Sequence, residues 1–206
     1  LANHPQVCAA GERHCLRNTL LDLGDLQNPD AMVKKMLDLS EDEIGRCAQV
    51  YFDEMQQFCD GDPFVVDTIP INFYYVGFIK LLFPKAKIIH CCRQPMDACW
   101  FIYQRSFSSK AYNYSNDLDA LATYYKGYRD LIEHWHSVLP GFIYDLHYEQ
   151  LISDTEDELP RLLSYVGLDW DGACLDQYEN VPLHQDEIGY WRNYQSYLEP
   201  LKAALG

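Results

Sequence analysis

The 206-residue sequence lacks three features that often guide the interpretation of a chain. It has no C-x-x-C pair among its eight cysteines, no apolar run of about eighteen residues, and no repeat or low-complexity segment. Without a long apolar run, we expect no membrane span, and no signal peptide is visible. The cysteine spacing indicates no disulfide framework and no metal site. We therefore expect a metal-free protein of a reducing, cytoplasmic compartment.

Positive charge is also scarce. Sixteen lysines and arginines face 31 aspartates and glutamates, which gives a formal net charge of -15. This imbalance argues against a general surface for nucleic acid or anionic membranes. It is compatible with a local cationic pocket for one small anion. Hydrophobic residues make up 48% of the chain, enough for a substantial core, so we expect one globular domain over residues 1–206.

Short apolar segments at 64–67, 87–92 and 142–147 are predicted strands, and helical patterns separate them. Strands that alternate with helices predict an α/β fold with a parallel sheet and right-handed crossovers. Ligands of such sheets lie beyond the carboxyl ends of the strands. Helices are predicted over residues 28–39, 41–58, 70–83, 95–107, 117–136, 156–166, 171–178 and 191–205.

Asp67, Arg93 and Tyr148 lie at or just past the predicted strand ends. Arg93 precedes a helix that begins near Pro95. A guanidinium beside a helix N-terminus offers a fixed fork of donors and free N–H groups to a phosphate or sulfate. The alternative is a structural ion pair between Arg93 and Asp97 or Asp67. The pattern alone favours neither interpretation.

Several motifs occur in an order that matches a known family. The string FVVDTIPINFYYVGFIKLLFPKAKIIHCCRQPMDACW resembles bacterial sulfotransferases that are often joined to tetratricopeptide repeats and are related to the tyrosylprotein sulfotransferases. The resemblance continues through ATYYKGYRDLIEHWHSVLP, IYDLHYEQL, RLLSYVGLDWDGACL and GYWRNYQSYLEPLKAALG. At the start, LANHPQVCAAGE resembles the segment that follows the nucleotide loop of this family. Nearly the whole chain is covered.

The resemblance implies a P-loop NTPase-like three-layer sandwich with a central parallel sheet, the sulfotransferase fold. It also implies an enzyme that moves a sulfuryl group from 3'-phosphoadenosine 5'-phosphosulfate (PAPS) to a hydroxyl or amine, releasing 3'-phosphoadenosine 5'-phosphate (PAP). The acceptor would be a small molecule, a glycan or a peptide. In this family no bound metal is required. A kinase of the P-loop class is the weaker alternative, because G-x-x-x-x-G-K-[ST] is absent.

Residue by residue, the resemblance assigns four roles. Glu12 falls on the general base, although a lone glutamate is more often a surface charge. Arg93 falls on the arginine that binds the donor's 3'-phosphate. Tyr148 falls beside the adenine, with a core tyrosine as the alternative, and Trp191 on the terminal helix packs against the cofactor edge or the core. Asn72 and Asp97 also match family positions, as residues that organise the backbone.

Four departures concern the donor. The family's phosphosulfate loop, P-x-S-G-T-T, and the strand before it do not precede LANHP in this sequence. Thr68 replaces a lysine, and Phe101 stands where a serine is usual. The connection PLHQDEIGYW is shorter than the family's basic loop. Two hypotheses follow: an N-terminally incomplete sulfotransferase, or a non-catalytic binding module with the same fold.

Overall fold

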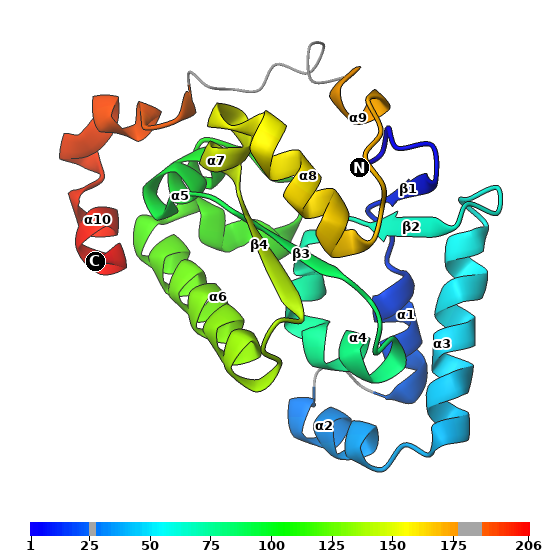
Figure 1. The fold of residues 1–206 in the computed structure, drawn as a ribbon. Helices are drawn as coiled ribbons and strands as arrows, with labels where there is room; N and C mark the ends of the chain where they lie inside the picture. Colours follow the sequence, from blue (N-terminus) through cyan, green and yellow to red (C-terminus); the bar gives the residue numbers. More distant parts are fainter. Residues whose placement is uncertain (25–27, 177–186) are drawn as a thin grey trace. The chain divides into compact units, whose positions relative to one another are not determined.

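The computed structural model describes residues 1–24, 28–176 and 187–206. Within these residues the chain forms two compact units. The first comprises residues 1–86 and 171–176, and the second comprises residues 87–170 and 187–206. Both units combine short parallel strands with helices (Figure 1). The mixed α/β class predicted from the alternation of strands and helices is therefore confirmed.

The first unit starts with a strand and reaches its second strand through three helices (Figure 1). A short 3-10 helix and a further α-helix follow the second strand, and one short helix comes from residues after 170. Its elements are β1 (Val7–Gly11), α1 (Cys15–Leu23), α2 (Pro29–Leu37), α3 (Glu41–Gln56), β2 (Phe64–Asp67), η1 (Pro70–Tyr75), α4 (Val76–Leu82) and α9 (Ala173–Asp176).

Two helices of this unit begin where their sequence signals predicted. The side chain of Asn28 accepts the backbone N–H of Ala31 and caps α2. Ser40 and Glu43 form a capping box at the start of α3, each satisfying the other's backbone N–H. These signals are local because the groups that satisfy the helix end lie within three residues of it.

Strand β1 is not among the strands predicted from the sequence, which begin at residue 64. It pairs in parallel with β2, from Val7 opposite Phe64 to Gly11 opposite Asp67. The segment is short and rich in alanine, which has little preference for strands. Its pairing with β2, more than fifty residues away, makes it a strand.

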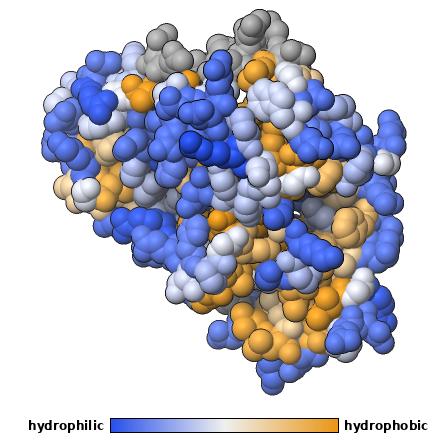
Figure 2. Space-filling model, in the orientation of Figure 1, coloured by the Kyte–Doolittle hydropathy of each residue, from blue (hydrophilic) through white to orange (hydrophobic). Residues whose placement is uncertain are grey.

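The core of the first unit lies between α1 and α4. Leu16 and Leu20 of α1 pack with Phe78 and Leu82 of α4, and all four are buried. Apolar side chains also reach the surface over α2 (Figure 2), where Leu37 is 81% exposed. Apolar burial between these helices is thus incomplete at the outer helix α2.

One disulfide joins Cys8 of β1 to Cys59, just after α3, with their Cα atoms 5.7 Å apart. The cysteine spacing had indicated no disulfide framework, and at this pair that expectation is wrong. The two residues are 51 positions apart in the sequence, so only the packing of β1 beside the end of α3 brings them together. The other cysteines in the described residues are free thiols.

The second unit also begins with a strand and reaches its second strand through helices (Figure 1). Its elements are β3 (Ile88–Cys92), α5 (Pro95–Tyr103), η2 (Lys110–Asn116), α6 (Leu118–Val138), β4 (Ile143–His147), α7 (Tyr148–Ser153), α8 (Thr155–Val166), η4 (Tyr190–Tyr197) and α10 (Glu199–Leu205).

Helix ends in this unit again follow local chemistry. Asp117 accepts the N–H of Ala120 and caps the long helix α6. Gly167 ends α8 in the left-handed conformation, at φ 85°, which glycine adopts without strain. These two boundaries match the prediction. The core forms where α10 packs against α5 and α6, with buried Cys99, Leu121 and Leu201.

Four predicted helices differ clearly in extent, among them 95–107, whose helix α5 ends at Tyr103. The segment 70–83 divides into η1 and α4, because Asn72 donates its backbone N–H to the Ile69 carbonyl three residues back. The segment 191–205 divides into η4 and α10 near Pro200, which has no N–H to continue a helix. Helix α9 covers part of 171–178, and residues 177 and 178 lie outside the described residues.

The four described strands form two separate parallel pairs, β1 with β2 and β3 with β4. Each pair joins strands that follow one another along the chain and are linked by helices, the βαβ arrangement. Parallel pairing was expected and is confirmed, whereas one continuous central sheet is not present among the described strands. No described strand of one pair hydrogen-bonds to a strand of the other pair. No helix in this part of the chain combines the length and apolar character needed to cross a membrane.

Candidate functional site

The strand ends of the second unit place chemistry where parallel sheets bind ligands. Strand β3 ends at Cys92 and Arg93 follows it directly, while β4 ends at His147 and Tyr148 follows that. Because Cys92 and His147 are register partners, Arg93 and Tyr148 leave the sheet at the same edge. The guanidinium of Arg93 lies 5.0 Å from the centre of the Tyr148 ring. Two of the predicted donor-binding residues are thus neighbours.

The Arg93 side chain is only 17% exposed, and its hydrogen bonds are incomplete. It forms an ion pair with Glu187 at 3.8 Å, in place of the Asp97 or Asp67 pairing considered from the sequence. Its Nε atom is buried without a hydrogen-bond partner among the described residues. Buried N–H groups are rarely left unpaired, and an unpaired one commonly marks a site for a water, an ion or a ligand.

A pocket of about 480 Å³ lies beside this arginine. Trp100, which also lines the pocket, has a buried indole Nε1 with no partner in the described part of the chain. A second guanidinium, Arg105, packs over the ring of Phe101 at 3.9 Å, while Arg93 lies 5.3 Å from the same ring. The pocket wall is completed by Asp97, Gln104, Glu187 and Tyr190.

Arg105 was not identified from the sequence. Twelve positions separate it from Arg93, and it lies beyond the end of α5, so no motif spacing indicates its location. Its contact with Phe101 brings it to the pocket. Two guanidiniums and the Trp100 indole N–H, with Arg93 Nε and Trp100 Nε1 unpaired among the described residues, make the pocket suited to an anion with an aromatic or apolar part.

Two acidic residues organise this region. The N–H of Gln94, at the N-terminus of α5, donates to Glu149 at 2.9 Å. The Glu149 carboxylate thus occupies one N–H group of the helix N-terminus at which the sequence predicts phosphate or sulfate binding. The buried Asp97 accepts the N–H of Gly189 at 2.7 Å, and burial raises the pKa of its carboxyl group. Asp97 therefore connects α5 to the start of η4.

In the first unit, Glu12 and Thr68 lie at the carboxyl ends of a paired set of strands. Glu12 follows β1 directly and is exposed, and Thr68 follows β2. The N–H of Thr68 donates to the Gly11 carbonyl at 3.2 Å, which fixes the two strand ends together. The structure therefore brings the predicted base and the residue at the family's lysine position to one sheet edge.

Asp67, at the same edge, is held within its own unit. It accepts hydrogen bonds from the Tyr51 hydroxyl, the Ile69 N–H and the Asn72 amide, at 3.3, 3.2 and 3.2 Å. Burial nevertheless raises the pKa of its carboxyl group. The Asn72 contact agrees with the organising role predicted for that residue.

Trp191 lies in η4 and is half-buried. Its ring contacts the Arg192 guanidinium at 5.2 Å. It is not among the residues that line either of the two described pockets. The structure therefore does not bring Trp191 into the group formed by Arg93 and Tyr148, and its contact with a cofactor stays a prediction.

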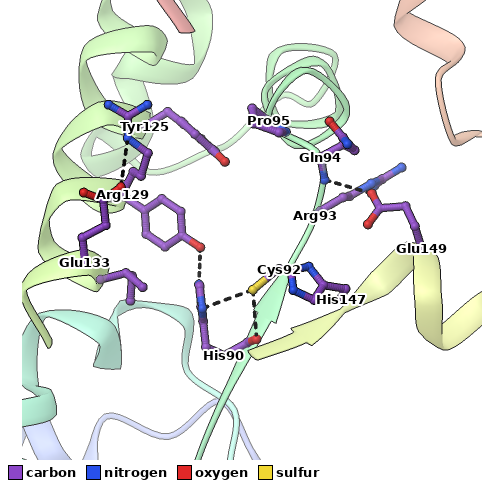
Figure 3. A pocket seen from close by; sticks show the side chains of 12 residues that line it. His90, Cys92, Arg93, Gln94, Pro95, Tyr125, Arg129, Glu133, His147 and Glu149 are labelled. Atoms are coloured by element: carbon purple, nitrogen blue, oxygen red, sulfur yellow. Dashed lines mark hydrogen bonds and ion pairs between the residues drawn. The ribbon is translucent and has the colours of Figure 1, made fainter. Parts of the chain in front are cut away.

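A second polar group lies on one face of β3 and β4, and the sequence analysis did not identify it. His90 Nδ1 is 2.7 Å from an Asp145 carboxylate oxygen and 3.3 Å from the Cys92 sulfur. His90 Nε2 contacts the Tyr128 hydroxyl, and His136 contacts Asp145 at 3.1 Å. A pocket of about 310 Å³ opens beside His90, Cys92 and Tyr128 (Figure 3).

The charges in this group are tightly coupled. Burial, with the nearby Asp145 carboxylate, raises the pKa of the Cys92 thiol to about 12. Burial also opposes ionisation of Asp145, but hydrogen bonds and charge from His90 and His136 outweigh it and lower the pKa of that carboxyl group. The sequence signal was the alternation in H-x-C and D-x-H, which is informative only once the two strands are known to pair.

Comparison with known proteins identifies the family. The sequence model of the sulfotransferase family matches residues 1–172. An uncharacterized protein of Aquifex aeolicus is 29% identical over 223 aligned positions, which cover 98% of this chain and 29% of that protein. The omega-hydroxy-beta-dihydromenaquinone-9 sulfotransferase Stf3 of Mycobacterium bovis is 31% identical over 110 positions, which cover 48% of this chain and 27% of Stf3.

Among solved structures, the sulfotransferase domain from the curacin biosynthetic pathway is similar with a TM-score of 0.49 and 17% identity. The alignment covers 79% of this chain and 58% of that one. The chain spans less than a third of the length of the two curated relatives. Because the family model matches residues 1–172 of 206, the chain belongs to the sulfotransferase family.

Proposed function

We propose that this chain is the donor-binding part of a sulfotransferase that transfers a sulfuryl group from PAPS to a hydroxyl or amine acceptor. One observation carries the proposal: the half-buried guanidinium of Arg93 has a buried Nε that no described residue pairs, beside a pocket that a second guanidinium, Arg105, also lines. Two guanidinium groups, each with several N–H donors in one plane, would bind an anion such as a 3'-phosphate. Family membership supplies the reaction class.

The proposed roles of the remaining residues follow from the resemblance. Glu12 accepts the acceptor's proton as the acceptor oxygen or nitrogen bonds to sulfur and the S–O bond to the leaving phosphate breaks. Tyr148 lies beside the adenine, and its contact with Arg93 supports a place in the same subsite. Trp191 contacts the cofactor edge or the core. Transfer requires positioning and stabilisation of charge more than covalent catalysis.

The fold we propose is the P-loop NTPase-like three-layer sandwich, with residues 1–206 as one domain of the subtype linked to tetratricopeptide repeats and tyrosylprotein sulfotransferases. The acceptor is a small molecule, a glycan or a peptide. The compartment is the cytoplasm, which agrees with the free thiols of the other described cysteines and makes the Cys8–Cys59 disulfide an exception. The parallel βαβ pairs support this fold. The strong negative charge supports the absence of nucleic-acid partners.

Calorimetric titration of the full-length protein with PAP tests the proposal. We expect Arg93→Ala to weaken PAP binding at least tenfold, about 1.4 kcal/mol, because the 3'-phosphate loses its bidentate partner. Arg161→Ala is the matched control, because Arg161 lies on α8, is 63% exposed and lines neither described pocket. Equal affinities in the parent protein and in both variants would remove Arg93 from the site.

A non-catalytic binding module is the second candidate. It is favoured by Thr68, whose hydroxyl cannot supply the positive charge of the family's lysine, and by Phe101, whose ring contacts both arginines of the pocket. Binding of PAP by the full-length protein, without turnover of PAPS in an acceptor screen, would select this candidate. A P-x-S-G-T-T loop upstream in the complete reading frame would favour the enzyme.

A further inference from the structure

Three potential metal-binding atoms converge on one face of the β3–β4 pair. They are His90 Nδ1, Cys92 Sγ and an Asp145 carboxylate oxygen, all within 4.8 Å of one another. Strand geometry explains the convergence. His90 and Cys92 are two residues apart and so share a face, and His90 is the register partner of Asp145. His147 is the register partner of Cys92, and Figure 3 shows the two side chains near each other.

The spacing of these atoms approaches that of a tetrahedral zinc site. Bonds of 2.0 Å to nitrogen or oxygen and 2.3 Å to sulfur separate neighbouring ligand atoms by about 3.3–3.5 Å. The Nδ1–Sγ distance is 3.3 Å and the Nδ1–carboxylate distance is 2.7 Å. A small rotation of the partly exposed Asp145 side chain would open the shorter distance. The strands themselves need not move.

Without a cation, two hydrogens hold the group together. One lies between His90 Nδ1 and Asp145, and the thiol hydrogen of Cys92 can go to the His90 carbonyl 3.4 Å away. A divalent cation would bind all three electron-pair donors at once. The ring hydrogen would then lie on Nε2, facing the Tyr128 hydroxyl, and the thiol hydrogen would be released to solvent. The cation would thus deprotonate the thiol, as coordinating metals do.

The surroundings already orient the donors as metal sites require. His90 Nε2 contacts the Tyr128 hydroxyl, which leaves Nδ1 free to face Cys92 and Asp145. His136 Nε2 also holds the Asp145 carboxylate, at 3.2 and 3.1 Å from its two oxygens. A histidine ligand held through its second nitrogen and a ligating carboxylate held by a further hydrogen bond are the usual outer contacts of a bound metal.

A catalytic triad does not explain the same residues. In a Cys–His–Asp triad the histidine uses one ring nitrogen for the thiol and the other for the carboxylate. Here both Cys92 and Asp145 face Nδ1, and Nε2 is directed at Tyr128. Proton transfer from the thiol through the ring to the carboxylate is therefore not available.

We propose that His90, Cys92 and Asp145 bind one divalent transition-metal ion, with Zn²⁺ as the best match. A mixed set of nitrogen, sulfur and carboxylate oxygen suits zinc and disfavours Mg²⁺ and Ca²⁺, which prefer oxygen ligands. His90 and Cys92 also line the pocket of about 310 Å³, which gives the ion a path of entry. The fourth ligand position faces that pocket and takes water. This replaces our sequence-based expectation of a metal-free chain.

Cobalt titration of the chelator-stripped full-length protein tests the site directly. We expect one equivalent of Co²⁺ to produce thiolate-to-cobalt absorption in the near ultraviolet, and Zn²⁺ to abolish it by displacement. Cys92→Ser should weaken Co²⁺ binding more than about 100-fold, and Tyr128→Phe by about 10- to 100-fold. No absorption change in the parent protein on adding Co²⁺ would overturn the proposal.

Cys91→Ser is the matched control, because Cys91 is the neighbouring residue on the opposite face of β3 and lies outside the proposed ligand set. It should bind Co²⁺ like the parent protein. Thermal unfolding checks the fold of each variant: Zn²⁺ should raise the Tm of the parent and of Cys91→Ser and leave Cys92→Ser unchanged. Equal Co²⁺ spectra or equal zinc-induced Tm shifts in the two cysteine variants would contradict the assignment.

Discussion

The ends of β2 and β3 each carry a charged residue after a short apolar segment, but the hydrogen bonding of the two residues differs in the structure. Asp67, at the end of β2, accepts three hydrogen bonds from its own unit. Arg93, just after β3, has one ion pair at 3.8 Å and a buried Nε without a partner in the described residues. A charged side chain at a strand end whose hydrogen bonds are all made by neighbouring residues organises the fold. A charged side chain with an unused hydrogen-bond donor is available to a ligand.

The difference also separates two kinds of chemistry. The edge of the β1–β2 pair presents an exposed carboxylate, Glu12, beside the neutral Thr68. The edge of the β3–β4 pair presents a half-buried cation beside an aromatic ring, Tyr148. In the proposed sulfotransferase, Glu12 at the first edge removes the acceptor's proton, and Arg93 at the second edge binds the donor's 3'-phosphate. Predictions on Glu12, Asp67 and Arg93 test this division, and one on the Cys8–Cys59 disulfide tests the packing of the first unit.

The largest effect is expected at Glu12. Replacing it with glutamine keeps its size and removes its basicity, so kcat for sulfuryl transfer by the full-length protein should fall about 100- to 10,000-fold. Steady-state assays with PAPS and a screened acceptor measure this. Asp60→Asn, an exposed carboxylate that precedes β2, is the control. An unchanged kcat in Glu12→Gln would mean that this edge does not supply the base.

The next effect concerns the disulfide in the first unit. Cys59→Ala should lower the free energy of unfolding by about 2–4 kcal/mol, because the unfolded chain regains the freedom of a long closed loop. Urea denaturation under non-reducing conditions measures it. Cys91→Ser, which removes a free thiol of the second unit, should change stability little. Equal stability of the Cys59→Ala variant and the parent protein would show that Cys8 and Cys59 are not bonded in solution.

Asp67→Ala should destabilise the protein by about 2–3 kcal/mol, because it leaves the Tyr51 hydroxyl and the Asn72 amide without their shared acceptor. Urea denaturation again provides the measurement, with the exposed Asp60→Ala as the control. A loss no greater than that of the control would show that Asp67 is not the organising residue of its strand end.

Arg93→Ala should have the smallest effect on stability, about 1 kcal/mol or less, because it removes only a long ion pair and ring contacts. Its loss of PAP binding should be larger than its loss of stability. If Arg93→Ala destabilised the protein as much as Asp67→Ala does, the contrast between the two strand ends would fail.

Local signals in the sequence predicted much of the secondary structure. The Ser40 capping box, the Asp117 cap and Gly167 each act through groups a few residues away, so their patterns predicted the ends of α3, α6 and α8. Strand β1 was missed, because a short alanine-containing segment becomes a strand only through its partner β2. The second half of 70–83 was correct, and the first half became a 3-10 helix.

The candidate site divides in the same way. Arg93 and Tyr148 were predicted from strand ends and family motifs, and the register of β3 and β4 makes them neighbours. The ion-pair partner of Arg93, Glu187, is 94 positions away and follows no motif. Arg105 likewise reaches the pocket through its packing on Phe101. Contacts at such separations depend on tertiary packing, which local sequence patterns do not encode.

The sequence by itself determined the family resemblance, the alternation of strands and helices, and the positions of the charged strand ends, because these depend on residue order and short-range periodicity. The tertiary structure decided which of those ends was satisfied. It also decided that Cys8 meets Cys59 and that His90, Cys92 and Asp145 share one face. The packing of β1 beside the end of α3 determines the first contact. The register of β3 against β4 determines the second, because it selects which distant side chains meet.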